Sequence, residues 1–149
     1  MMTAPLNIFI VDDEAPARAR LRRLLEDCRA AFPNQVVGEA GLAHAALAAP
    51  ALSMADVVLL DIEMPGMDGL GCARELMKRK PAPTVIFTTS HADYALKAFD
   101  VAASDYLLKP VRLQRLVESL SRVQRRLPVA EEARAAQRQR QGEGVQSAC

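Results

Sequence analysis

The sequence lacks several features that would point to particular classes of protein. Its three cysteines, Cys28, Cys72 and Cys149, are too few and too scattered for a disulfide framework or a zinc site. The formal net charge is only +1, so bulk charge predicts no nucleic-acid or membrane partner. No apolar run has membrane-spanning length, and the first residues do not resemble a signal peptide. We therefore expect a cytoplasmic protein with buried thiols at Cys28 and Cys72.

What the sequence does contain is a regular alternation of short apolar runs and amphipathic segments. The apolar runs end at polar or turn residues and predict buried strands at 6–11, 35–40, 57–61, 84–88 and 105–108. Apolar residues at helical spacing predict helices at 14–32, 43–49, 70–79, 92–102 and 113–123. This alternation indicates an α/β fold, with a doubly wound five-stranded parallel sheet covered on both faces.

The composition changes near Leu127. Residues 128–149 have no apolar stripe and mix acidic with basic side chains, which is typical of a linker or tail. We therefore expect one folded domain over residues 5–127, followed by a polar tail.

Polar and charged residues follow the expected strands at the ends where a site would form. In open parallel sheets, ligands bind beyond the carboxyl ends of the strands, where the strand order switches. The residues at or just past these ends are Asp12, Asp13, Asp61, Thr89, Ser90 and Lys109. Three carboxylates, a hydroxyl and an ammonium group are thus expected at one edge of the sheet.

This combination of groups predicts phosphoryl chemistry assisted by a metal. Three crowded carboxylates repel one another, which would raise the pKa of at least one of them. Mg²⁺ would relieve that repulsion, because it prefers oxygen ligands. With the cation present, Asp61 could attack a phosphoryl group as a carboxylate nucleophile. Lys109 and the Thr89 hydroxyl would then stabilise the charge on the transferred oxygens.

Four segments carry a resemblance to a known family. In this order and spacing, "VDDE" (11–14), "LLDIEMPGMDG" (59–69), "TTS" (88–90) and "LKP" (108–110) resemble the receiver domain of two-component response regulators, which has a flavodoxin-like (βα)5 fold. The resemblance covers roughly residues 6–125. It implies that Asp61 is the phosphoacceptor. It also implies a Mg²⁺ site formed by Asp12, Asp13, Asp61 and the backbone carbonyl of Glu63.

The same resemblance assigns the residues that would respond to phosphorylation. It implies that Thr89 is the switch hydroxyl, that Lys109 pairs with the phosphoryl group, and that Tyr106 is an aromatic switch residue. It further implies a structural role for Pro110 through a cis peptide bond with Lys109. Phosphorylation would shift the region of the fourth helix, fifth strand and fifth helix.

The segment "IFTTSHADYALKAFDVAASDYLLKP" is similar to receivers of the LytTR group of transcription regulators. That similarity implies a sensor histidine kinase as phosphodonor, homodimerisation on phosphorylation, and DNA contact only through an output domain. We expect that domain to be absent from this chain, which is then either a truncated regulator or a stand-alone receiver. The similarity also implies that the chain is a phosphoacceptor and not an enzyme, with at most slow self-catalysed phosphorylation and dephosphorylation.

Several of these residues could have a purely structural role instead, or the role could belong to a neighbouring residue. Asp12 and Asp13 could cap a helix, and Thr88 or Ser90 could stand in place of Thr89. Tyr106 could be a core aromatic. His91 could either cap a helix or tune the lifetime of the phosphoryl group.

Three broader alternatives also remain. The arginines near the last helix could form a solvated face or pair across a dimer, namely Arg112, Arg115, Arg122, Arg125 and Arg126. A phosphatase of the haloacid dehalogenase type would need a second Asp where Glu63 stands. A degenerate receiver would act only as an interaction module.

Overall fold

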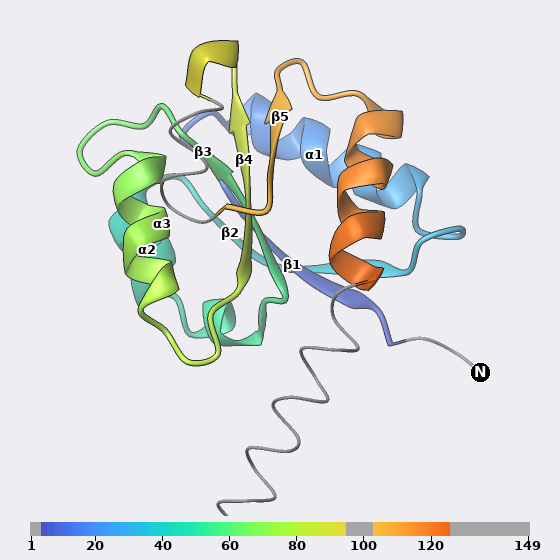
Figure 1. Ribbon diagram of the computed structural model, residues 1–149, viewed down its shortest axis with the longest axis horizontal. Coiled ribbons are helices and arrows are strands. Elements are labelled where there is room, and N and C mark those ends of the chain that lie inside the picture. Colours follow the sequence, from blue (N-terminus) through green and yellow to red (C-terminus); the bar gives the residue numbers. More distant parts are fainter. Residues whose placement is uncertain (1–3, 95–102, 126–149) are drawn as a thin grey trace, which may run out of the picture.

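The five apolar runs form one parallel sheet in the computed structural model, which describes residues 4–94 and 103–125 (Figure 1). The strand order is β2-β1-β3-β4-β5, so the order reverses between β1 and β3. All neighbouring strands pair in parallel. The bounds are β1 (Leu6–Val11), β2 (Asn34–Ala40), β3 (Val57–Asp61), β4 (Thr84–Thr89) and β5 (Asp105–Leu108). The predicted doubly wound α/β fold is confirmed.

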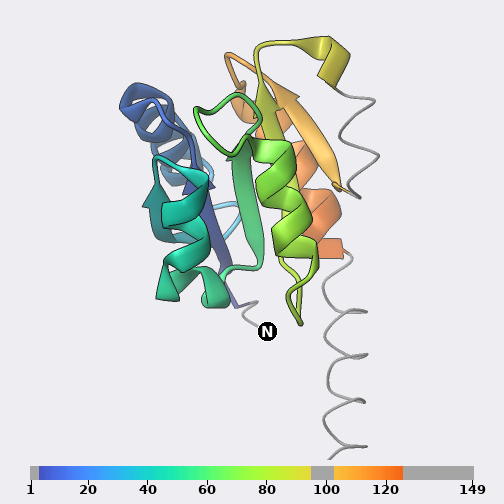
Figure 2. The same cartoon turned by 90° about the vertical axis from the view of Figure 1, so that its left-hand side faces the viewer.

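Helices cover both faces of the sheet (Figures 1 and 2). On one face lie α1 (Ala15–Asp27) and a helix at residues 113–125, and on the other lie α2 (Ala43–Ala48) and α3 (Gly69–Met77). Strand side chains alternate between the two apolar clusters, because successive residues of a strand point to opposite faces. In β1, Ile8 and Ile10 pack toward α1, whereas Phe9 and Val11 pack toward α2 and α3.

The amphipathic pattern of α1 explains its place in the fold. Leu21, Leu24 and Leu25 are buried, while arginines occupy the outward positions between them. Pro16 lies in the first turn, where a missing backbone N–H leaves no hydrogen bond unmade. The helix therefore presents leucines to the sheet and guanidinium groups to its own flanking loops.

Some boundaries differ from those expected. β4 continues to Thr89, one residue beyond the predicted end, and a 3₁₀ turn at Pro50–Met54 follows α2. The predicted helix at 92–102 begins as a 3₁₀ turn at Ala92–Tyr94, and the rest of that prediction lies outside the described residues. The predicted tail at 128–149 also lies outside them.

The two cysteines in the described residues have the environment expected of them. Cys28 follows α1 directly, Cys72 lies in α3, and both are buried free thiols. Burial raises the pKa of the Cys72 thiol to about 11. In the described part of the chain, no helix combines the length and apolar character that crossing a membrane requires.

Candidate functional site

Asp61 is the last residue of a strand that is otherwise entirely apolar. Residues 57–61 are all buried, and Asp61 is only 2% exposed. Gly69, the first residue of α3, lies directly against its backbone. A side chain at Gly69 would place its Cβ 2.2 Å from the Asp61 carbonyl oxygen, a distance that no real contact permits. The chain can fold back from β3 into α3 at this point only because residue 69 has no side chain.

Asp12 and Asp13 bring two further carboxylates to Asp61. One oxygen from each of these three residues lies within 4.8 Å of the others. Asp12 is fully buried and Asp13 is exposed. One carboxylate oxygen of Asp12, Oδ1, accepts a hydrogen bond from the backbone N–H of Glu14 at 2.9 Å. Asp12 thus helps to start α1, although Glu14 occupies the N-cap position.

Lys109 follows the edge strand β5, and its side chain reaches this acidic cluster. Its Nζ lies 2.9 Å from Asp12 Oδ2 and 3.4 Å from Asp61 Oδ1. The Lys109–Pro110 peptide bond is cis, as the family resemblance predicted. The backbone N–H of Lys109 donates to the carbonyl of Thr89 at 2.7 Å, which ties the lysine to the end of β4.

The electrostatics of the cluster follow from burial and like charge. Burial, reinforced by the negative charge of Asp12, raises the pKa of Asp61 to about 7 despite the opposing effect of Lys109. Burial alone would lower the pKa of Lys109. The hydrogen bond to Asp12 and the charges of both carboxylates outweigh that effect and raise the Lys109 pKa above its ordinary value. One ammonium group therefore does not fully compensate the clustered carboxylates.

The donor set fits a hard divalent cation. Asp12, Asp13 and Asp61 offer closely spaced carboxylate oxygens on a sheet edge, and Asp13 keeps that edge open to water. Mg²⁺ is bound in proteins by one or a few carboxylates while it keeps several waters. The cluster could therefore hold such an ion, and the positive charge would relieve the repulsion that raises the Asp61 pKa.

Thr89 lies at the rim of the cluster and is engaged with Glu63 and His91. Its hydroxyl donates to Glu63 Oε1 at 3.3 Å and accepts the backbone N–H of His91 at 3.0 Å. The His91 Nε2 in turn lies 3.3 Å from Glu63 Oε2, and its ring meets Tyr94 edge to face. The structure thus groups Thr89 with these two exposed side chains.

The neighbours of Thr89 differ from it in their environment. Thr88 is as buried as Thr89, but its hydroxyl has no hydrogen-bond partner among the described residues. Ser90 is exposed. Tyr106 is half-buried on β5 and packs against the apolar cluster beneath α2 and α3, so it contributes to the core whatever else it does.

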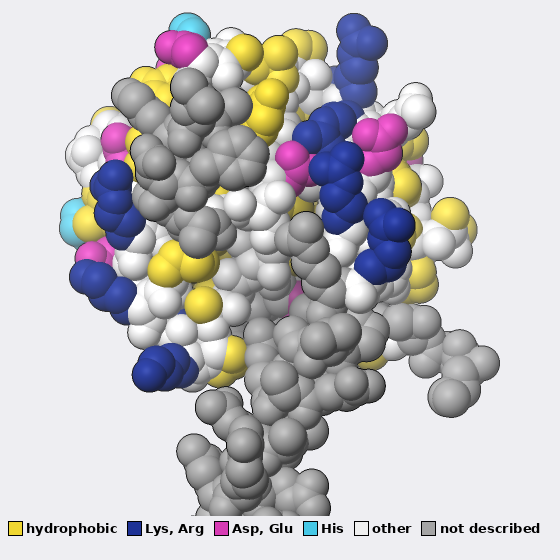
Figure 3. Space-filling model, viewed as in Figure 1, with side chains coloured by type: hydrophobic (Ala, Val, Ile, Leu, Met, Phe, Trp, Pro, Cys, Tyr) yellow, Lys and Arg dark blue, Asp and Glu magenta, His cyan; other side chains and the backbone are white. Residues whose placement is uncertain are grey.

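Two arginines of the last helix pair with a carboxylate of the same chain. Arg115 makes two hydrogen bonds to Asp105, at 3.0 and 2.7 Å, and Arg122 lies 3.3 Å from the same carboxylate. Burial alone would raise the pKa of Asp105, but the hydrogen bonds from Arg115 and the Tyr106 N–H hold it below its ordinary value. Figure 3 shows basic side chains gathered over this helix. Arg126 lies outside the described residues.

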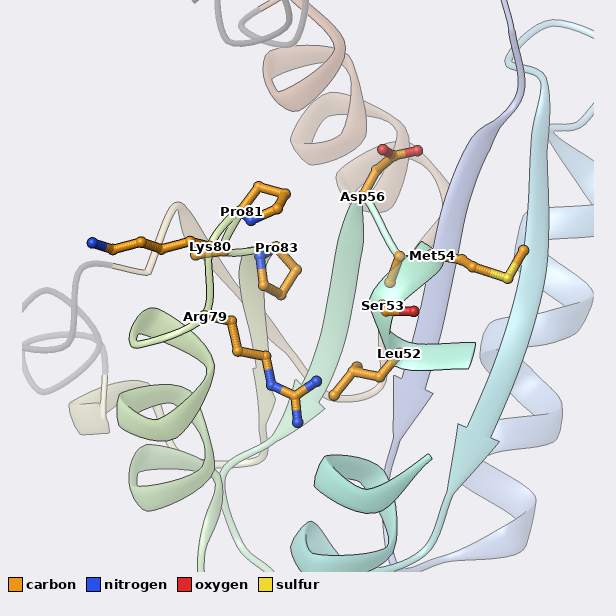
Figure 4. A pocket seen from close by; sticks show the side chains of 10 residues that line it. Leu52, Ser53, Met54, Asp56, Arg79, Lys80, Pro81 and Pro83 are labelled. Atoms are coloured by element: carbon orange, nitrogen blue, oxygen red, sulfur yellow. The ribbon is translucent and has the colours of Figure 1, made fainter. Parts of the chain in front are cut away.

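A separate pocket of ≈ 380 Å³ lies at the amino ends of β3 and β4 (Figure 4). Residues 52–56 and 79–83 line it. Arg79 and Lys80 point in different directions, and Arg79 donates to the carbonyl of Leu47. The pocket has no pair of converging charges, and it lies at the opposite edge of the sheet from Asp61.

Some residues that shape the site were not recognised in the sequence. Gly69 is one of them, although the pattern Asp68-Gly69 before a helix is a usable signal, since Asp68 caps α3 by accepting the Gly71 N–H. The engagement of Thr89 by Glu63 had no signal in the sequence, because it depends on side-chain orientation.

The fold and the acidic edge together define a flavodoxin-like α/β domain of the receiver type. Comparison with known proteins identifies the family. The chain belongs to the response regulator receiver domain family, which matches residues 8–121. It is the receiver domain of a response regulator in two-component signalling. Such domains are generally signalling phosphoacceptors and not enzymes, they interact with sensor kinases, and they often dimerise.

Two curated relatives refine this assignment. The Positive alginate biosynthesis regulatory protein of Pseudomonas aeruginosa is 46% identical over 123 residues, which is 80% of this chain and 48% of that protein. The Sensory transduction protein LytT of Bacillus cereus is 38% identical over 117 residues, covering 78% of this chain and 46% of that protein. These relatives confirm the likeness to LytTR-group receivers. The chain spans about half the length of the curated relatives it matches.

A solved structure agrees with the fold. The REC domain of AraT, a response regulator from Geobacillus stearothermophilus, is 32% identical and superposes with a TM-score of 0.75. The match covers 86% of this chain and 99% of that domain.

Proposed function

We propose that Asp61 accepts a phosphoryl group from a sensor histidine kinase, with Mg²⁺ held by Asp12, Asp13, Asp61 and the backbone carbonyl of Glu63. One observation carries this proposal. A buried carboxylate at the end of β3 lies within 4.8 Å of two other carboxylates and 3.4 Å from an ammonium group. A cluster of like charges in which two of the three carboxylates are buried is costly unless a cation relieves it.

The side chains of this chain suit each part of the transfer. An Asp61 oxygen forms the new O–P bond while the P–N bond of the donor phosphohistidine breaks and the imidazole nitrogen keeps the electron pair. When bound, Mg²⁺ neutralises charge on the phosphoryl oxygens and favours the ionised form of Asp61. Lys109 supplies a second positive charge, since its Nζ already lies beside both Asp12 and Asp61.

Phosphorylation would change the partner of Thr89. Its hydroxyl now donates to Glu63 at 3.3 Å, a long hydrogen bond. A phosphoryl group on Asp61 would offer a more strongly charged acceptor nearby. Movement of Thr89 toward it would alter the packing beside Tyr106 and shift the population of conformations on the surface of the predicted fourth helix (92–102), β5 and the 113–125 helix. This surface would then control homodimerisation.

The output would be transcription. The curated relatives are about twice as long as the matched region, and they carry the names of regulatory and transduction proteins. We propose that a LytTR-type DNA-binding domain acts downstream of this receiver, and that DNA is contacted through that domain alone.

Intact-mass measurement with acetyl phosphate and Mg²⁺ tests the proposal. The wild type should gain one phosphoryl group, about 80 Da, only when Mg²⁺ is present. Asp61→Asn should gain nothing, and size exclusion of the same samples should show the wild type dimerising on phosphorylation. A wild type that gains no mass would instead be a receiver that acts only as an interaction module. Sustained turnover of small phosphate esters would indicate a phosphatase.

A further inference from the structure

The arginines of α1 are not simply a solvated face. α1 carries four of them, Arg18, Arg20, Arg22 and Arg23. Two of these donate hydrogen bonds to backbone carbonyls in the loops that hold the candidate site. A backbone carbonyl accepted by a guanidinium group fixes the course of a loop, because the planar fork of Arg presents several donors in a rigid arrangement.

Arg18 holds the loop that carries the acidic pair. Its Nη1 donates to the carbonyl of Asp12 at 2.6 Å, and its Nε donates to Glu39 Oε1 at 3.1 Å. Glu39, on β2, also pairs with Arg22, so Arg18 is anchored to a carboxylate that is itself held in place. The side chain of Arg18 is only 21% exposed. A Cβ at Gly41 would approach Arg18 Nη1 to 3.3 Å, so the glycine leaves room for the guanidinium group.

Arg20 holds the loop that carries the lysine. Its Nε and Nη2 both donate to the carbonyl of Val111, at 3.2 and 2.7 Å. Val111 lies two residues after Lys109 and directly after Pro110. The two arginines thus start two residues apart on one helix and reach the two sides of the site.

The need for such a device follows from the sheet order. Asp12 and Lys109 meet at 2.9 Å although they are 97 residues apart in the sequence. They follow β1 and β5, which β3 and β4 separate in the sheet. The ends of β1 and β5 therefore share no strand ladder. α1 packs on the same face as the 113–125 helix and is the element that contacts both loops.

We propose that Arg18 and Arg20 are positioning residues that set the acidic pair and Lys109 at their working separation. The proposal rests on the proposed function, because the separation matters only if the cluster binds Mg²⁺ and a phosphoryl group. Residues that orient metal ligands from behind affect metal affinity strongly, and small displacements at a reacting centre slow the reaction.

Three methionine variants test the proposal with matched changes of charge. Arg18→Met and Arg20→Met remove the guanidinium donors, and Arg23→Met removes an exposed guanidinium from the same helix as a control. Calorimetric titration of the unphosphorylated protein with Mg²⁺ gives the dissociation constant without any transfer step. Arg18→Met should raise that constant about 10-fold. Arg23→Met should change it by less than about 2-fold, since an exposed charge is well screened.

Transfer from acetyl phosphate separates the two roles, because this donor needs no docking surface. Slow transfer in Arg18→Met should return toward the wild-type rate as Mg²⁺ is raised. Slow transfer in Arg20→Met should persist at saturating Mg²⁺, at about one-tenth of the wild-type rate, because the displaced group is Lys109. Arg18→Lys keeps the charge but not the fork, and it should recover part of the Mg²⁺ affinity.

Three results would overturn the proposal. The first is a Mg²⁺ dissociation constant for Arg18→Met equal to that of the wild type. The second is an equal weakening in Arg18→Met and Arg23→Met, which would show that the effect does not come from the contact between Arg18 and the Asp12 carbonyl. The third is full recovery of Arg20→Met at high Mg²⁺. A wild type that binds no Mg²⁺ and gains no phosphoryl group would reject the proposed function, and the positioning roles with it. Should Arg18→Met fail to fold by circular dichroism, the Arg18→Lys titration decides.

Discussion

Two aspartates at opposite ends of β3 show how the same side chain serves different purposes. Asp56, just before the strand, accepts the backbone N–H of Asn7 at 2.8 Å and is half-exposed. Asp61, at the other end, is buried with another carboxylate close by, and its pKa is raised to about 7. A carboxylate satisfied by a backbone N–H supports the fold. A carboxylate held in electrostatic conflict is suited to bind a cation or react.

Exchanging each aspartate for asparagine should give the largest difference between the two ends of β3. Asp61→Asn should abolish phosphorylation by acetyl phosphate, because the amide is not a nucleophile toward phosphorus under these conditions. Asp56→Asn should retain it, since the amide oxygen can still accept the Asn7 N–H. Intact mass after incubation with Mg²⁺ measures both. Full labelling of Asp61→Asn would show that another residue is the acceptor.

Gly69→Ala should have the next largest effect. The new methyl group would meet the Asp61 backbone at 2.2 Å, so that backbone must move. We expect a loss of about 1–3 kcal/mol in the free energy of unfolding. We also expect phosphorylation about 10²-fold slower.

Gly71→Ala is the matched control for this substitution. Its Cβ would meet the flexible side chain of Met67 at 3.1 Å and Asp68 Oδ1 at an ordinary contact distance of 3.6 Å. Its stability should change by less than about 1 kcal/mol, partly because alanine favours a helix. Urea denaturation and a phosphorylation time course measure both variants, and equal behaviour of the two would contradict a specific role for Gly69.

The free energy of unfolding should depend on pH through Asp61. Without Mg²⁺, the folded chain holds a proton on Asp61 up to about pH 7, whereas the unfolded group titrates near its ordinary value of 3.8. The free energy of unfolding should therefore fall as the pH rises through this window. Asp61→Asn removes the effect, so it should be more stable than the wild type by about 4 kcal/mol above pH 7 and equal to it near pH 4.

Denaturation curves at several pH values measure this difference. Added Mg²⁺ should reduce the advantage of Asp61→Asn, because the cation stabilises the wild-type carboxylate. A gain in stability of Asp61→Asn that does not depend on pH would show that the ionised Asp61 carboxylate does not destabilise the fold.

Asp105 is a third aspartate at the end of a strand, and substitution of its arginine partners should have the smallest effects on stability. It lies at the amino end of β5 and is satisfied by arginine side chains. Arg115→Ala removes two hydrogen bonds to Asp105 and one to the Tyr106 carbonyl, and it should cost about 1 kcal/mol. Arg122→Ala removes a longer, more exposed pair and should cost less than about 0.5 kcal/mol. Thermal denaturation at low and high salt measures both losses of stability. A larger loss for Arg122→Ala than for Arg115→Ala would contradict the view that Arg115 is the main partner of Asp105.

The parts of the fold that follow from local pattern were predictable. The third strand ends at Asp61 as expected, because an apolar run that meets a carboxylate and a Pro-Gly turn leaves little freedom. Parallel pairing then brings Asp12, Asp13, Asp61 and Lys109 to one edge, so the acidic cluster and its lysine were predictable as a set.

Other features depend on contacts that no local pattern encodes. The register between β1 and β2 shifts after Ile8, so that Val37 has no direct partner in β1. The position of Thr89 within β4, and not beyond it, depends on its pairing with Leu108. The distance between the Gly69 and Asp61 backbones depends on how α3 settles on the sheet.

The tyrosines give this fold a consequence for spectroscopy. The chain has two tyrosines and no tryptophan. Tyr94 and Tyr106 both pack against the apolar cluster under α2 and α3, and Tyr94 also touches the His91 ring beside Thr89. Near-ultraviolet fluorescence of the unmodified chain therefore originates from two tyrosines of this cluster, one of them beside the His91 ring, and we expect its intensity to change on phosphorylation without any introduced label.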